Sequence, residues 1–374
     1  MDGTLTGRRR CLPVPWAPAP LEESSVTRAR IAALLLAACG LVAGCATPPF
    51  AATPDPAAPL VLAKQGSFFV GGRDLRSDAL SLLPAYLPSG TITVDQMYVR
   101  YQVPVDAKPR PITLIHGCCL TGKTWETTPD GRMGWDEYLV RKGYPVYVID
   151  QASRGRSAAN PTVIDSVKMG KAPPDQLPPV FSVGHETAWV NFRLGPEYPK
   201  AYPGAQFPVE AVAEFWKQMV PDWYSALPTP NPTVAALSEL AIRLESTVLI
   251  SHSQSGIYPF QTAMLNSKGI AGIVAIEPGT CPDAKGDMTP FTKMPILVLW
   301  GDYVNLSPRW LPRLTACKAF VEAVTKAGGT IENVVLPEIG IRGNSHMLMQ
   351  DKNNLEVADW LLAWIDRNLK TRTQ

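Results

Sequence analysis

A serine that follows a run of apolar residues is the first candidate for chemistry in this chain. Ser253 lies in the stretch Leu249-Ile-Ser-His-Ser-Gln-Ser-Gly256, where small residues stand on both sides of it. A serine hydroxyl becomes a nucleophile when a neighbouring base takes its proton, and histidine is the usual base. The chain has 4 histidines, and His346 alone follows Ser253. The pair predicts acyl transfer through a covalent intermediate; a simple serine-rich turn and an exposed loop histidine are the alternative interpretations.

Short apolar segments and helix-like stretches alternate around these two residues. Near-continuous apolar runs are typical of strands buried on both faces, and they occur at 111–115, 145–149, 247–250, 270–276, 295–299 and 331–336. Two β-like segments precede them, at 66–70 and 91–103. Helical spacing of apolar residues occurs at 234–244, 314–324 and 355–365. The alternation predicts an α/β fold with a mostly parallel central sheet flanked by helices.

The interval from about 158 to 232 interrupts this alternation. It contains many prolines and several large aromatic residues, among them Trp189 and Trp216, but no clear strand. A structureless loop of that length is rare in a compact domain, and long loops are usually functional. We therefore expect a cap inserted after the fourth predicted strand, the alternative being a surface excursion with no role at the site.

The serine motif resembles the nucleophile elbow of the α/β-hydrolase superfamily, in which a tight strand-to-helix turn presents the serine. The match is incomplete, because Ser251 and Ser255 occupy the two usual glycine positions and Gly256 comes one place later. Chain order in this family is serine, acid, histidine. His346 fits that order, since it follows the last predicted strand. The resemblance implies an α/β-hydrolase domain over residues 65–374 that cleaves carboxylic esters.

Two acids are candidates for the third member of a triad. Many family members carry the acid after the strand that here ends at Trp300, but Val304 occupies the usual position. Glu277 directly follows the 270–276 strand, a place that other branches of the fold use for the acid. Glu277 is therefore preferred over Asp302, its alternative role being a turn residue paired with a neighbouring cation.

An oxyanion hole is expected after the 111–115 strand. The sequence His116-Gly-Cys-Cys119 resembles the His-Gly motif that supplies one backbone amide in this family. The residue after the nucleophile supplies the other amide. These positions assign the oxyanion hole to Cys118 and Gln254.

The predicted domain holds four of the chain's 7 cysteines, at 118, 119, 281 and 317. Four cysteines in an oxidising compartment allow three pairings, and spacing does not choose among these and free thiols. The adjacent cysteines, the Ser-His-Ser-Gln-Ser elbow and Glu277-Pro-Gly together resemble a small branch of secreted bacterial serine esterases. That branch carries a disulfide between neighbouring cysteines at the oxyanion hole. The resemblance implies a Ser, Glu, His triad and the disulfides Cys118–Cys119 and Cys281–Cys317.

Residues 1–45 resemble an export signal. Residues 31–43 form an unbroken run of apolar or small residues, too short to span a bilayer but typical of a signal sequence. The run ends in Leu41-Val-Ala-Gly-Cys45, which resembles the lipobox of bacterial lipoproteins and implies lipidation of Cys45; an ordinary secretory signal is the alternative. Residues 1–25 are atypical of a signal start, so translation from near Val26 is a further alternative.

Residues 46–64 are rich in Ala, Pro and Thr, and this composition predicts a flexible tether. We expect an exported protein, periplasmic or anchored to the outer membrane by lipid, with secretion as the alternative. Its expected partners are a small ester substrate and a second copy of the chain in a homodimer.

The composition gives no reason to expect nucleic acid, because the net charge is +2 and no long basic run occurs. No metal or cofactor is expected, since the chain lacks a Cys-x-x-Cys pair and has few histidines. The rival functions are a lactonase or thioesterase with the same triad, and a catalytically inactive lipoprotein that binds a ligand.

Overall fold

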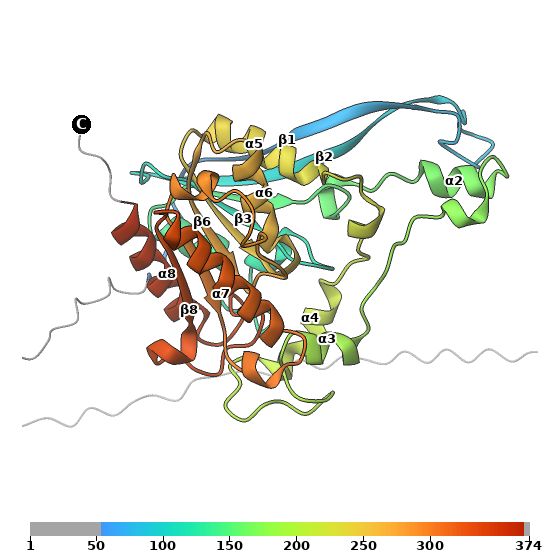
Figure 1. Ribbon diagram of the computed structural model, residues 1–374. Coiled ribbons are helices and arrows are strands. Elements are labelled where there is room, and N and C mark those ends of the chain that lie inside the picture. The colour runs from blue at the N-terminus through green and yellow to red at the C-terminus, as the bar shows by residue number, and fades with distance from the viewer. Residues whose placement is uncertain (1–53, 370–374) are drawn as a thin grey trace, which may run out of the picture. The chain divides into compact units, whose positions relative to one another are not determined.

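The computed structural model describes residues 54–369 (Figure 1). The predicted export signal, Cys45 and the first part of the predicted tether lie outside these residues. The first strand begins at Leu62, inside the stretch predicted as tether, so the folded domain starts slightly earlier than expected. No helix among residues 54–369 has both the length and the apolar character needed to cross a membrane.

An 8-stranded sheet forms the centre of the domain, in the order β1-β2-β4-β3-β5-β6-β7-β8. From β4 to β8 neighbouring strands are parallel, and β1 and β2 join that edge in antiparallel pairing. The strands are β1 (Leu62–Ser77), β2 (Gly90–Pro104), β3 (Ile112–Ile115), β4 (Val146–Asp150), β5 (Thr247–His252), β6 (Ile270–Ile276), β7 (Ile296–Trp300) and β8 (Ile331–Val335). The predicted α/β architecture is confirmed.

Helices cover both faces of the sheet, because successive side chains of each buried strand point to opposite sides. In β5, Val248 and Ile250 join one apolar core with α1 and α8, whereas Leu249 joins a second core with α5, α6 and α7. Burial on both faces explains why these strands are uninterrupted apolar runs in the sequence. The covering helices are α1 (Trp135–Arg141), α5 (Pro232–Leu244), α6 (Tyr258–Leu265), α7 (Leu311–Lys326) and α8 (Asn354–Asn368).

The β1–β2 hairpin is longer than the sequence predicted. β1 extends to Ser77, beyond the predicted 66–70 segment, and most of its side chains are exposed. Gly71 and Gly72 have φ of 64° and 92°, so the apolar alternation stops there while pairing with β2 continues. Figure 1 shows the two strands running out together toward the segment that contains α2 (Thr162–Lys168).

The predicted insertion lies between β4 and β5. Its regular elements are short, namely α2, α3 (His185–Asn191), α4 (Val212–Lys217) and single 3-10 turns. It contributes no strand to the sheet, as the sequence indicated.

Candidate active site

Ser253 stands at a sharp turn between β5 and the 3-10 helix η6 (Ser253–Ile257). Its φ of 59° is a left-handed conformation that non-glycine residues adopt at a cost, and such strain gathers at functional sites. The Ser255 hydroxyl lies 3.0 Å from the His252 carbonyl oxygen and 3.2 Å from that of Ile115. A serine at a usual glycine position therefore ties the turn to β3.

Gly256 supplies the close approach that the family's usual glycines provide. A Cβ at this position would lie 2.5 Å from the Cβ of Pro278, in the loop after β6. Ser251, at the other usual glycine position, directs its hydroxyl to the Val274 carbonyl of β6 at 3.4 Å. The elbow thus keeps its geometry with a shifted glycine.

Ser253, His346 and Glu277 form a continuous chain of contacts. His346 Nε2 lies 2.8 Å from Ser253 Oγ, and His346 Nδ1 lies 3.2 Å from Glu277 Oε2. The histidine and the glutamate are fully buried, and Ser253 is 6% exposed. The three residues follow β5, β6 and β8, whose carboxyl ends meet at one edge of the parallel sheet. A hydroxyl, an imidazole and a carboxylate therefore stand in the order that activation of a hydroxyl requires.

Glu277 is held as a carboxylate by a partner that the sequence did not reveal. Arg193 Nη1 donates to Glu277 Oε2 at 2.9 Å, and Nη2 donates to Oε1. The backbone amide of Gly301 donates to Oε1 at 2.5 Å. Burial alone would raise the pKa of Glu277, but the Arg193 charge and the hydrogen bond with His346 outweigh it and lower the pKa to about 2.

The carboxylate of Asp302 contacts backbone amides and not the imidazole of His346. Its carboxylate accepts hydrogen bonds from the backbone amides of Tyr303 at 2.7 Å and Gly343 at 2.9 Å. These bonds hold the loop after β7 against the loop that carries His346. The structure brings Glu277, and not Asp302, into contact with the imidazole.

The imidazole of His346 is enclosed by aromatic rings. The ring centroid of Trp310 lies 4.2 Å from that of His346, and Phe192 stacks on it at 5.7 Å. Burial lowers the pKa of His346 to about 4; the positive charges of Arg193 and Arg309 act in the same direction and Glu277 opposes them. At neutral pH the ring is therefore uncharged and can accept a proton.

Asp351, also missed by the sequence analysis, organises the loop that carries His346. It is fully buried and accepts hydrogen bonds from Ser345 N at 2.8 Å, Ser345 Oγ at 2.7 Å and Asn344 Nδ2 at 3.1 Å. No sequence signal pointed to it, because it is an acidic residue in an irregular segment.

The amides assigned to the oxyanion hole lie at the ends of β3 and β5. Gln254 is the second residue of η6, where backbone amides have no partner within the helix. Across residues 54–369 the Cys118 amide makes no hydrogen bond either. The Gln254 side chain accepts from Arg154 at 3.0 Å and donates to Asp222 at 3.3 Å. The buried Arg154–Asp222 ion pair thus fixes the surroundings of this segment.

One of the two predicted disulfides is present. Cys281 and Cys317 are joined, with a Cα–Cα distance of 5.2 Å. The Cys118–Cys119 disulfide is wrong for this structure, which has two free thiols. The Cys119 amide and Sγ lie 3.0 Å and 3.7 Å from Asp222 Oδ2.

Cys118, Cys119 and Asp222 form the single group of potential metal ligands in the described range, with their ligand atoms within 4.8 Å of one another. A hydrogen bond with Cys119, burial and the Asp222 charge raise the pKa of Cys118, so its thiol stays protonated. Arg154 already neutralises Asp222, and its positive charge disfavours a cation at this place.

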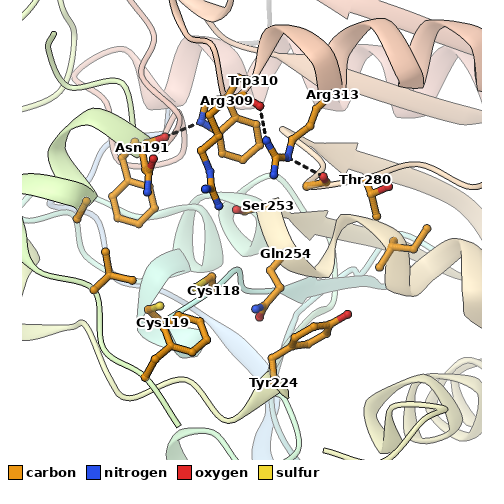
Figure 2. Close-up of a pocket in the computed structure, with 16 residues that line it drawn as sticks. Cys118, Cys119, Asn191, Tyr224, Ser253, Gln254, Thr280, Arg309, Trp310 and Arg313 are labelled. Atoms are coloured by element: carbon orange, nitrogen blue, oxygen red, sulfur yellow. Dashed lines mark hydrogen bonds between the residues drawn. The ribbon is translucent and has the colours of Figure 1, made fainter. Parts of the chain in front are cut away.

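A cavity of about 400 Å³ opens onto Ser253 (Figure 2). Cys118, Gln254 and Gly279 come from the strand ends, and Trp310 lies just before α7. The inserted segment supplies much of the remaining wall, through Phe181, Val183, Ala188, Asn191, Phe192 and Tyr224. The insertion therefore borders the cavity that contains Ser253.

The chain is similar to known hydrolases of esters. No family model matches the chain. The solved structure of a novel bacterial esterase is 63% identical, with a TM-score of 0.83, and covers 84% of this chain and 99% of its own. The curated protein "Probable secreted lipase phiG" from Fungal sp. (strain ATCC 74256) is 29% identical over 318 residues, which are 72% of this chain and 86% of that protein.

The chain belongs to the α/β-hydrolase superfamily and is a carboxylic ester hydrolase. The sequence-based expectation of this family, fold and enzyme class is confirmed.

Proposed function

We propose that the protein cleaves carboxylic esters through an acyl-enzyme, with Ser253 as nucleophile, His346 as base and Glu277 as acid. The observation that carries this proposal is the continuous contact from Ser253 Oγ through both His346 ring nitrogens to Glu277 Oε2. An uncharged imidazole beside the hydroxyl and a carboxylate behind the imidazole are the protonation states that this chemistry needs.

In the first half-reaction, His346 Nε2 takes the Ser253 proton as Oγ bonds to the ester carbonyl carbon. The amides of Cys118 and Gln254 donate to the negative oxygen that develops; one such donor typically lowers the barrier by about 3 kcal/mol. Glu277 stabilises the imidazolium. When the carbon–oxygen bond to the alcohol breaks, the imidazolium returns its proton to the departing alkoxide.

The second half-reaction uses the same residues with water as nucleophile. His346 takes a proton from water while the water oxygen bonds to the acyl carbon. Collapse of this intermediate breaks the bond to Ser253 Oγ, which recovers its proton from the imidazolium. A carboxylic acid is released and the enzyme is restored, with no cofactor consumed.

Replacement of the nucleophile tests the proposal. Ser253→Ala and His346→Ala should each abolish hydrolysis of 4-nitrophenyl butyrate while the protein stays folded. A fluorophosphonate probe should label the wild type but not Ser253→Ala. Ser267→Ala, which alters a serine outside the cavity lining, is the matched control and should keep full activity and labelling. Full turnover by folded Ser253→Ala would overturn the proposal, and an unlabelled, inactive wild type would favour the ligand-binding lipoprotein.

The same machinery would open a lactone or a thioester, since both present an acyl carbon to Ser253. A panel that compares esters, lactones and thioesters of equal acyl length would rank these alternatives by kcat/KM.

We also propose that the protein is exported and that lipid on Cys45 is its contact with the membrane. The "secreted" lipase relative supports export, and the sequence that ends at Cys45 supports lipidation. Wild-type protein from cells fed labelled palmitate should carry label and partition into Triton X-114, whereas Cys45→Ala should lose both properties. An exported wild-type protein without label would favour an ordinary secretory signal.

A further inference from the structure

Two arginines line the cavity at Ser253, and neither has a carboxylate partner among residues 54–369. Arg309 is exposed, and Arg313 is half-buried on the first turn of α7. Both belong to the cavity lining together with Ser253. Other arginines near this site are paired, because Arg193 binds Glu277 and Arg154 binds Asp222. The cavity therefore has two guanidinium groups whose charges no carboxylate of the described residues balances.

Arg313 is fixed by backbone contacts. Its Nε donates to the Gly279 carbonyl at 2.9 Å, and its Nη1 donates to the Arg309 carbonyl. The guanidinium carbon lies 5.2 Å from the centre of the Trp310 ring. These contacts orient the group but leave its charge uncompensated.

Arg309 makes fewer contacts. Its guanidinium carbon lies 5.8 Å from the centre of the Trp310 ring. Figure 2 shows its side chain reaching from the backbone beside Trp310 in the direction of Ser253. This direction places the positive charge of Arg309 at the cavity that Ser253 also lines.

The charges around the cavity are one-sided. The lining contains two arginines and no aspartate or glutamate. Burial and the neighbouring Arg309 charge lower the pKa of Arg313, which shows that the two cations act on each other. Arg309 is also near enough to His346 to lower the pKa of the imidazole. An anion between the arginines would relieve this repulsion.

We propose that the ester substrate carries a carboxylate, which Arg309 and Arg313 bind while Ser253 attacks the ester carbonyl. This inference rests on the proposed function and names its substrate class. A planar guanidinium donates two parallel hydrogen bonds to a carboxylate, which gives orientation as well as affinity. The apolar wall that Phe181, Val183 and Phe192 provide would hold the uncharged part of the substrate.

Matched ester pairs test the proposal. One pair carries the charge on the acyl side, namely 4-nitrophenyl hydrogen adipate and its neutral methyl ester. The other carries it on the alcohol side, namely 4-carboxyphenyl butyrate and its neutral methyl ester. Wild-type kcat/KM should favour the charged member of at least one pair, and Arg309→Gln or Arg313→Gln should reduce that preference about tenfold. The ratio within a pair cancels changes that affect every ester alike.

Arg76→Gln is the control, because Arg76 is an exposed arginine of β1 outside the cavity lining. Its preference ratio should equal that of the wild type. Arg309→Glu should reverse the preference, and added salt should weaken it. Equal ratios in wild type and both glutamine variants would overturn the inference while Ser253-dependent hydrolysis of the neutral esters left the proposed function intact. Loss of the neutral reaction's dependence on Ser253 would instead overturn the proposed function.

Discussion

Arg193 and Glu277 form a fully buried, two-pronged ion pair directly behind the imidazole of His346. The carboxylate contacts His346 Nδ1 with Oε2, the same oxygen that accepts from Arg193 Nη1. One guanidinium therefore sets both the charge and the orientation of Glu277. Arg193 touches none of the reacting atoms, so it is a positioning residue.

Replacement of Arg193 should impair turnover through Glu277. Arg193→Gln removes the charge that keeps the pKa of Glu277 low and leaves the buried carboxylate without its cation. We expect kcat to fall about 100-fold, the scale of a misplaced catalytic group. Because the Arg193 charge also lowers the pKa of His346, the acid limb of the pH profile should move to higher pH. A loss of stability with an unchanged pH profile and normal kcat would contradict this role.

The two candidate acids should respond differently to amide substitution. Glu277→Gln should lower kcat roughly 10⁴-fold, because the imidazolium loses its stabilising charge and its orientation. Asp302→Asn should change kcat less than about tenfold and cost about 1 kcal/mol of stability, since it weakens one of two backbone hydrogen bonds. Steady-state kinetics and urea unfolding of both variants check this. The reverse order of losses would assign the acid to Asp302.

The pH dependence of kcat/KM should report the lowered pKa of His346. Only the neutral imidazole accepts the Ser253 proton, so activity is lost as the pH falls through this pKa. Because burial, Arg193 and Arg309 lower the pKa from 6.5 to about 4, activity should stay nearly full at about pH 6. Arg309→Gln should shift the midpoint upward for a neutral ester. Circular dichroism must show a folded protein at each pH, and a wild-type midpoint near 6.5 would contradict the expectation.

The Cys281–Cys317 disulfide should stabilise the fold more than it affects the chemistry. It links residues 36 apart, from the loop after Glu277 to α7. Closing a loop of that length restricts the unfolded chain and contributes about 3–4 kcal/mol. The double variant Cys281→Ser with Cys317→Ser should lose this amount in urea unfolding, and reduced wild type should match it. Equal stability of the oxidised and reduced wild type would exclude this contribution.

The buried strands were predictable because the physics that places them also marks the sequence. A parallel strand covered on both faces needs apolar residues at every position, and β6 matches its predicted range, 270–276. β1 is exposed along most of its length, so its pairing with β2 leaves little trace in composition. The short helices of the insertion likewise leave little periodic signal in the sequence.

The candidate site divides in the same way. Ser253 and His346 could be predicted from the sequence, because a local motif and the scarcity of histidine single them out. Arg193 could not be predicted, because it lies 84 residues from Glu277 in an irregular segment and no spacing relates the two. The adjacent cysteines show the opposite failure. The resemblance to a branch of secreted esterases implied a bond between them, whereas both are free thiols in the structure and Cys119 contacts Asp222 instead.

The insertion between β4 and β5 supplies both a wall of the cavity and the counterion of Glu277. Phe192 stacks on His346, and the next residue, Arg193, binds Glu277. Grafting this loop from a relative, a common way to change an enzyme's selectivity, would therefore remove the acid's counterion along with the wall. A graft that keeps Phe192 and Arg193 would retain both the ring that stacks on His346 and the counterion of Glu277.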